Sequence, residues 1–327
     1  MVARVRTYIL LAAMVLLASC QKELCMDHHH DGMKVRVIFD WTNADPDPTT
    51  VKGMTLLLYP EDGGAPLRYP FSDIKGGVIS ITSGNYRALC VNDDELLQLV
   101  NADSWETVSV TTGETSILSR ADFNDTRADI PQSESSSAER VLREPPLLYS
   151  DTCNTFYIRA TEEEQVLRMY PQMLLGRMHI RFENVENLEY VVSMSAAISN
   201  LSSSLNLSTQ QPSESHCTMP INLYVTDDGA IEGYLYYFGH CPSEQMIHEL
   251  TLYTMLIDTS KQARIFDVTD LIHDDDSGGG GEGGDDDEDK EVEITIPNLP
   301  LPTPQPAEGG FNLKLDEWTI NTIDIKM

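Results

Sequence analysis

The chain has 327 residues, with 22 Lys and Arg against 52 Asp and Glu, and a formal net charge of −30. Its hydrophobic fraction of 41% is enough to build cores, which excludes a wholly disordered chain. The length suggests two domains of roughly 150 residues each. The acid excess excludes nucleic acid as a partner, because a phosphate-binding surface needs a surplus of Lys and Arg.

Residues 1–19 predict a lipoprotein signal peptide. Two arginines near the start are followed by an apolar run over residues 8–17. As a helix this run would rise about 15 Å, half of a ~30 Å hydrocarbon core, so it is too short to span a membrane. The run ends in Leu17-Ala18-Ser19-Cys20, which resembles a bacterial lipobox. The resemblance implies acylation of Cys20 and a lipid anchor.

Residues 20–32 are predicted to be a tether. Gln21 and Lys22 follow the cysteine with no Asp directly after it, and by resemblance to Gram-negative lipoproteins this favours the outer membrane. The tether also carries three adjacent histidines at 28–30, which can bind zinc or copper weakly. Because a preorganised metal site needs ligands on rigid elements, we interpret these histidines as part of a solvated tether.

Residues 33–118 predict a first antiparallel β-sandwich. Val35, Val37 and Phe39 lie on one face of an alternating run, as in a half-buried strand. Turn clusters rich in Gly, Pro and Asp separate the following runs. A parallel α/β sheet is excluded because the gaps are too short for helices. The other predicted strands of this domain are residues 54–59, 78–82, 86–91 and 107–111.

Residues 119–147 are predicted to connect two domains, since Ser and Pro replace large apolar residues there, with a short helix around 137–143. Residues 148–327 then predict a second, larger sandwich. The expected fold class is therefore all-β, with two tandem antiparallel β-sandwiches. The strands predicted in the second domain are residues 155–159, 176–183, 188–194, 222–226, 231–238, 248–257, 264–266, 292–296, 312–315 and 318–325.

The end of the chain is predicted to be a strand. Ile323 and Ile325 alternate onto one face, and together with Trp318 and Ile320 they mark a candidate terminal or donor strand. A terminal strand is the element most easily exchanged with a neighbouring molecule.

Five cysteines follow Cys20, and one pair can be placed. Asp228-Gly229 is a turn signal, and a loop at 228–230 would set Cys217 opposite Cys241 in a hairpin. A cross-strand disulfide is then feasible in an oxidising compartment. A register shift of one residue would prevent it, so two free thiols remain the alternative.

An acidic insert at residues 274–290 holds nine acidic residues and one lysine. In an EF-hand register its oxygen ligands would come from Asp274, Asp276, Glu282 and Asp285. The twelfth position is Asp where a bidentate Glu is usual, and no flanking helix pair is predicted. We interpret the insert as a solvated loop, with weak cation binding as the alternative.

No catalytic signature is found. The sequence lacks a Gly-x-Ser-x-Gly elbow, a His-Glu-x-x-His zinc helix, a dinucleotide fingerprint and a phosphate-binding loop. We therefore expect no enzyme and no cofactor. A hydrolase with a converging pair of carboxylates stays an alternative, because such geometry is invisible in sequence.

Several segments resemble Bacteroides-type fimbrillin-related lipoproteins. These are the lipobox, residues 23–28, Phe39-Asp40-Trp41, residues 54–60, Gly84-Asn85-Tyr86 and residues 266–270. The resemblance implies two tandem transthyretin-like sandwiches and a role in fimbria or adhesin assembly, with other fimbrial subunits as partners through strand addition. Only 12 residues separate Cys20 from Met33, which favours an anchor or minor subunit over a polymerising stalk.

The alternative function is a surface glycan-binding module, or binding of a host ligand. Sugars stack on exposed aromatic rings, and the richest cluster is Tyr234, Tyr236, Tyr237 and Phe238. Because a strand alternates, one face of this cluster must be core.

Overall fold

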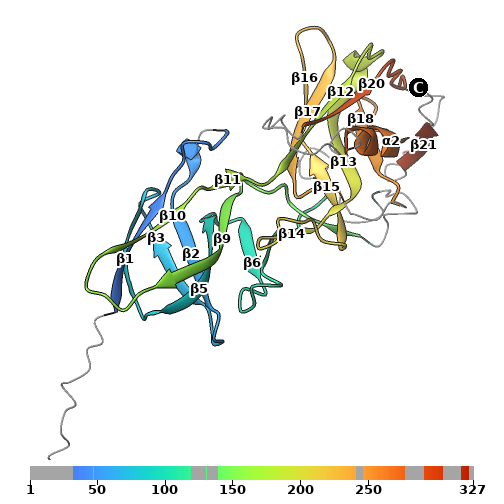
Figure 1. Cartoon of the computed structure of the whole chain (residues 1–327). Helices are drawn as coiled ribbons and strands as arrows, with labels where there is room; N and C mark the ends of the chain where they lie inside the picture. The colour runs from blue at the N-terminus through green and yellow to red at the C-terminus, as the bar shows by residue number, and fades with distance from the viewer. Residues whose placement is uncertain are drawn as a thin grey trace, which may run out of the picture.

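The computed structural model describes residues 32–46, 48–118, 130, 139–240, 246–276, 291–304 and 318–323. These residues form two β-sandwiches that lie end to end, with a small third sheet between them (Figure 1). The predicted all-β sandwich class is confirmed. Within the described residues, no helix has the length and apolar character needed to cross a bilayer.

The first sandwich packs a three-stranded sheet against a five-stranded one. Val35, Val37 and Phe39 face Leu56 and Leu58 across its core, as alternation predicts. The three-stranded sheet has the order β10-β1-β4, with β1 at Met33–Phe39, β4 at Gly76–Ile81 and β10 at Gln165–Met169. The five-stranded sheet has the order β11-β9-β5-β2-β3, with β2 at Met54–Pro60, β3 at Leu67–Phe71, β5 at Gly84–Asn92, β9 at Tyr149–Ile158 and β11 at Gln172–Met173.

The predicted boundary at residue 148 is wrong. Strand β9 pairs with β5, and β10 pairs with β1, so both strands belong to the first sandwich although they lie after residue 148. Alternation shows that a segment is a strand, but it does not show which sheet the strand joins. The predicted connection also contains a structural part, because β8 at Arg140–Val141 pairs with the second sandwich where a short helix was expected.

The second sandwich packs a four-stranded sheet against a six-stranded one. The four-stranded sheet has the order β16-β17-β12-β20, with β12 at Gly176–Phe182, β16 at Leu223–Val225, β17 at Ile231–Tyr237 and β20 at Glu291–Ile296. The six-stranded sheet has the order β21-β19-β18-β13-β15-β8, with β13 at Val191–Ser202, β15 at His216–Ile221, β18 at Glu249–Leu256, β19 at Lys261–Asp267 and β21 at Trp318–Ile323. Helix α2, Thr269–Asp276, follows β19 and lies beside β20.

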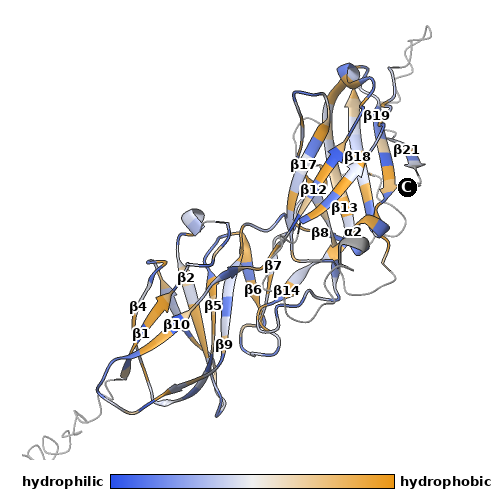
Figure 2. Ribbon diagram, turned by 45° about the horizontal axis from the view of Figure 1, so that its top comes forward, coloured by the Kyte–Doolittle hydropathy of each residue, from blue (hydrophilic) through white to orange (hydrophobic). Residues whose placement is uncertain are grey.

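One hydrophobic core runs from the second sandwich into the first. Strands β6 (Leu97–Val100), β7 (Ser109–Thr112) and β14 (Ser204–Asn206) form the small sheet between them (Figure 2). Val108 and Val110 pack in one cluster with Leu57 and Leu89, which lie on the outer face of the first sandwich, and with the core of the second. The sandwiches therefore share buried apolar surface.

The parallel pairs among the described strands all add an edge strand. β10, β8, β20 and β21 each join their sheet at its edge in this way. A parallel partner cannot be reached by a hairpin, so each arrives after a long connection. The sheets are otherwise antiparallel, as expected.

Candidate functional site

The outer face of the sheet β16-β17-β12-β20 carries a row of charged and aromatic side chains. On β12, residues 178, 180 and 182 point into the core, so Arg177, His179 and Arg181 point outward. The register sets Glu291 and Glu293 of β20 on one side of this row. On the other side it sets Tyr236, Tyr234 and Glu232 of β17, and Tyr224 of β16 lies beyond Glu232.

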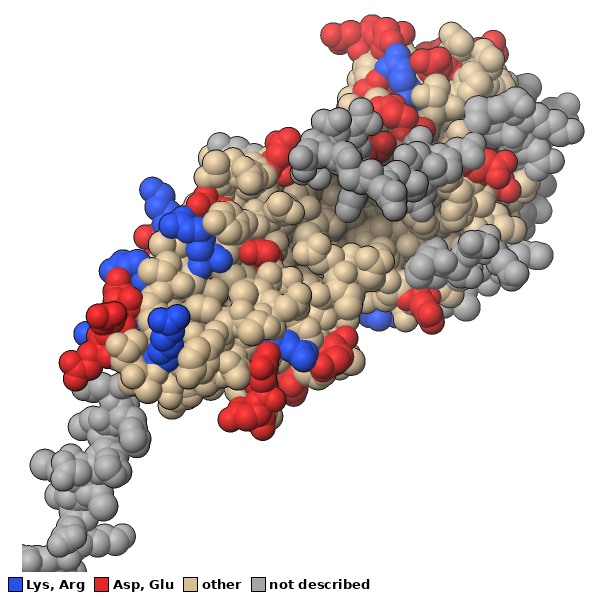
Figure 3. Space-filling view, in the orientation of Figure 1, with Lys and Arg blue, Asp and Glu red and all other residues tan. Residues whose placement is uncertain are grey.

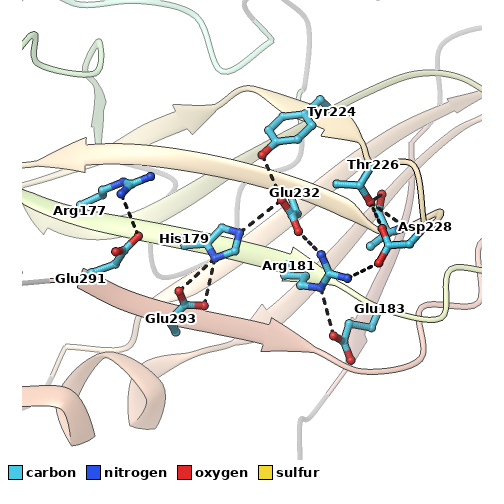
Figure 4. Close-up of polar contacts among 11 residues, drawn as sticks. Arg177, His179, Arg181, Glu183, Tyr224, Thr226, Asp228, Glu232, Glu291 and Glu293 are labelled. Carbon is cyan, nitrogen blue, oxygen red and sulfur yellow. Dashed lines mark hydrogen bonds and ion pairs between the residues drawn. The ribbon is translucent and has the colours of Figure 1, made fainter.

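Arg181 is the centre of an ion-pair network on this face (Figure 4). Its guanidinium contacts Asp228 at 2.6 Å and Glu183 at 3.1 Å, and it also pairs with Glu232. The Thr226 hydroxyl and the Arg181 guanidinium both donate to Asp228, which lowers the pKa of that carboxyl to about 2. The network fixes the β16–β17 hairpin to the sheet.

His179 connects the charged groups to a row of aromatic rings. Its Nδ1–H donates to Glu293 at 3.0 Å, and its Nε2 lies 3.6 Å from Glu232. The His179 ring stacks on Tyr234 with centroids 4.4 Å apart and planes 7° apart. Arg177 lies 4.5 Å from the Tyr234 centroid, and Tyr224 continues the row at 6.4 Å.

A pocket of about 230 Å³ opens beside this row, where the face meets the first sandwich. Arg177, Glu291 and Tyr236 line it from the sheet, and Asp45 and Pro46 line it from the first sandwich. Rings, a guanidinium and carboxylates arranged around a small hollow suit a polar, hydroxylated ligand. On the face drawn in Figure 3, acidic residues lie over both sandwiches, whereas Lys and Arg lie mostly over the first.

The predicted aromatic cluster is divided by the sheet. Tyr237 and Phe238 are buried core residues, as one face of an alternating strand requires. Tyr234 is 37% exposed and lies on the outer face with Tyr236. Sequence reasoning missed Tyr224, which is 45% exposed, and its only signal was a position in a strand next to a turn.

The predicted terminal strand forms an edge of the second sandwich. β21 pairs in parallel with β19, from Trp318 opposite Lys261 to Ile323 opposite Phe266. Trp318 is partly buried against Tyr253, whereas Ile320 is 52% exposed. Ile325 lies outside the described residues.

The pairing behind the predicted disulfide is wrong. β15 pairs with β13 in one sheet, while β16 pairs with β17 in the other, so the chain changes sheets after Ile221. Cys217 is opposite Leu201 and is buried, and this burial raises the pKa of its thiol to about 12. Cys241 lies outside the described residues, so the bond itself stays a prediction.

Other predicted site residues lie beyond the described ranges. These are the signal peptide, Cys20, the tether up to residue 31, Glu282 and Asp285. The backbone of Asp274 and Asp276 belongs to α2, where a calcium loop would need an open turn. The weak cation site therefore has no support from the described residues.

The chain belongs to the family described as Domain of unknown function (DUF5119), whose model matches residues 19–222. No curated protein sequence matches it.

Solved structures from Bacteroidetes share this architecture. A candidate adhesin from Bacteroides ovatus superposes with a TM-score of 0.60 at 18% identity, covering 87% of this chain and 98% of its own. The fimbrial anchor protein Mfa2 from Porphyromonas gingivalis gives 0.48 at 14% identity, covering 81% and 90%. A candidate polysaccharide-binding protein from Bacteroides thetaiotaomicron gives 0.45 at 8% identity, covering 82% and 91%. The chain therefore shares the two-sandwich fold of the Bacteroides ovatus protein.

Proposed function

We propose that this protein is a non-enzymatic, lipid-anchored component of fimbrial or adhesin assembly at the cell surface. It acts as an anchor or minor subunit, and it joins its partner by strand addition. The lipobox at Cys20 and the likeness to a candidate adhesin support the location and the class of function. The absence of a catalytic motif in the sequence supports a binding role.

The observation that carries the proposal is the way β21 is attached. Its backbone forms one parallel ladder with β19, and four of its side chains, at positions 319–322, are exposed. Trp318 is the one partly buried side chain among those described on this strand. Main-chain bonds of this kind can be supplied equally well by a strand from another molecule. The edge of β19 is therefore suited to strand exchange.

A reversible lock tests the exchange. Gln262 and Thr319 are directly opposite, so the double substitution Gln262→Cys and Thr319→Cys should close a disulfide between β19 and β21. The probe is a synthetic peptide of residues 318–327. We expect the peptide to bind a chain truncated after residue 317. It should not bind the oxidised double-cysteine variant, and it should bind that variant once the disulfide is reduced. Single-cysteine variants are the controls, and a truncated chain that ignores the peptide would refute strand addition.

The anchor is tested separately. Cys20→Ala should move the protein from the outer-membrane fraction to the soluble fraction, because one lipid-modified residue is the only anchor proposed. Retention of this variant in the membrane would show that the protein is held there by something else.

A second candidate function is glycan binding at the ring row of Tyr224 and Tyr234. The observation that favours it is the exposed pair of stacked rings next to a pocket lined by Arg177 and Glu291. Tyr224→Ala and Tyr234→Ala should abolish polysaccharide binding on a glycan array. Tyr157→Ala, which removes a more exposed ring from the first sandwich, is the control. An unmodified chain that binds no polysaccharide eliminates this candidate.

A further inference from the structure

Three histidines from separate segments meet beside α2. His240 follows β17, His248 precedes β18, and His273 lies within α2. Their ring centroids are 5.2 Å apart for His240 and His273, 5.3 Å for His248 and His273, and 6.3 Å for His240 and His248.

The backbone around His248 holds the cluster in place. The His248 N–H donates to the Thr269 hydroxyl at 2.9 Å, and the His248 carbonyl accepts from the Val268 N–H at 2.9 Å. The start of α2 is therefore bonded to His248 on both sides, and His273 follows about one turn along the helix. These bonds make the spacing of His248 and His273 a property of the fold.

Two ring nitrogens in the cluster are buried without a hydrogen-bond partner. His248 is fully buried, and its Nδ1–H donates to the Ser199 carbonyl at 3.2 Å. A carbonyl can only accept, so the lone pair of His248 lies on Nε2, and this Nε2 has no partner. The Nε2 of His273 is likewise buried and unpartnered. Leaving a polar atom buried without a partner is unfavourable, so two neighbouring ones suggest a bound ligand or ion.

We propose that His240, His248 and His273 form a binding site for a late first-row divalent metal ion such as Zn²⁺. An imidazole anchored through Nδ1–H to a carbonyl, with Nε2 directed inward, is the usual arrangement of a metal-bound histidine. Imidazole ligands favour Zn²⁺, Ni²⁺ and Cu²⁺ over Ca²⁺ and Mg²⁺. Three histidines also leave a coordination position open for water or a partner's side chain.

The ring separations are close to those that ligation requires. With nitrogens about 2.0–2.1 Å from zinc, a ring centroid lies about 3.2 Å from the metal, and tetrahedral ligation places two centroids about 5.2 Å apart. Two of the three separations already have this value. In the described part of the chain no group of three or more His, Cys, Asp or Glu is already arranged to hold a metal. Binding therefore requires His240 and His248 to approach each other by about 1 Å.

Zinc titration of the full chain tests the site. The parent protein carries Ser at positions 28–30 in place of the three tether histidines, has no histidine tag, and is treated with chelator first. We expect one equivalent of Zn²⁺ to bind and to raise the melting temperature. His273→Gln and His240→Gln should each weaken binding by at least about tenfold and remove the thermal shift. His179→Gln and His216→Gln, which change histidines outside the cluster, should leave both unchanged.

Three results would overturn the proposal. The parent binds no stoichiometric Zn²⁺, or His273→Gln and His240→Gln bind it as the parent does, or Mg²⁺ gives the same thermal shift as Zn²⁺. The last result would assign binding to carboxylates, because Mg²⁺ takes oxygen ligands. Circular dichroism of each variant verifies folding. His248→Gln is left out of the series, because the fully buried ring of His248 also packs in the core.

Discussion

The indole ring of Trp318 packs edge-on against the phenol ring of Tyr253, with centroids 5.5 Å apart and planes at 82°. Tyr253 is 1% exposed and belongs to a small cluster on the outer side of the six-stranded sheet, on β18. Lys261 of β19 lies 5.8 Å from the centroid of the same indole. The backbone of β21 pairs with β19 alone. The Trp318 side chain therefore adds contacts from β21 to both β18 and β19.

Trp318→Ala should release β21 locally without unfolding the sandwich. An edge-to-face ring pair contributes about 0.5–1.5 kcal/mol beyond its buried area, so opening of the edge should become roughly tenfold more frequent. Hydrogen exchange should accelerate over residues 261–266 and stay unchanged over β12. Thr319→Ala, on an exposed position of the same strand, should have no such effect. Equal exchange in both variants would mean that the ladder alone holds β21.

Leu89→Ala should uncouple the two sandwiches. Leu89 is fully buried in the cluster that also contains Val108, Val110 and the second core. Loss of a buried Leu costs about 2–5 kcal/mol, and here the cavity lies between domains. Calorimetry should show one transition for the unaltered chain and two for the variant.

The control for this experiment is Leu58→Ala. Leu58 is equally buried on β2 but faces the core of the first sandwich. The Leu58→Ala variant should have a lower melting temperature but still unfold in a single transition. Two transitions in the unaltered chain, or a split transition in Leu58→Ala, would show that the shared cluster does not couple the domains.

Arg181→Gln should raise the pKa of Asp228. The pKa of this carboxyl is about 2 because Thr226 and Arg181 donate to it, and removal of the cation should move it toward the ordinary value of 3.8. The midpoint is measured by NMR titration of the Asp228 carboxyl. A midpoint that stays near 2 would assign the whole effect to the hydroxyl of Thr226.

The same substitution should destabilise the chain, because Glu183, Asp228 and Glu232 are left without their shared cation. Arg36→Gln is the matched control, since Arg36 has one exposed partner, Glu164. An exposed pair of that kind contributes little to stability, because water and salt screen its charges. Urea unfolding should therefore show a larger loss of stability for Arg181→Gln than for Arg36→Gln. Equal losses of stability would contradict a cooperative network.

Glu139→Gln should stabilise the protein at pH 7. Burial raises the pKa of Glu139, and although its Oε2 accepts from Thr218 and the Asn200 N–H, its Oε1 is buried without a partner. Because the pKa of Glu139 is raised in the native state, the native protein takes up a proton at a higher pH than the unfolded chain as pH falls from 7 toward 4.5. The stabilisation by Gln should therefore shrink over this range.

Urea unfolding at pH 7 and pH 4.5 measures this difference. Glu114→Gln serves as the control, because Glu114 is an exposed partner of Arg140 and has a small desolvation cost. A Glu139→Gln variant that is less stable than the parent at pH 7 would mean that the hydrogen bonds to the carboxylate outweigh its burial.

The candidate sites were predictable only in part. The alternation over residues 231–238 predicted that one face of the aromatic cluster would be core, and Tyr237 is buried on that face. It could not show that Tyr234 stacks on His179, because that contact depends on the pairing of β17 with β12, which lie about 50 residues apart. The histidine cluster had no sequence signal, since its members share neither a motif nor a spacing.

What the sequence determined by itself is local. Alternating apolar residues such as Val35, Val37 and Phe39 commit a segment to a strand and select its buried face, because successive side chains point to opposite sides. The all-β class and the terminal strand followed from that periodicity.

Only the tertiary structure decided which strands pair. β9 joins the first sandwich instead of the second, β15 and β16 separate into different sheets, and β21 takes a parallel edge. Pairing is decided by the burial of both faces of whole sheets, a property of contacts between segments far apart in the chain. For that reason the β21 edge, the ring row and the three histidines appear only once the strands are assembled.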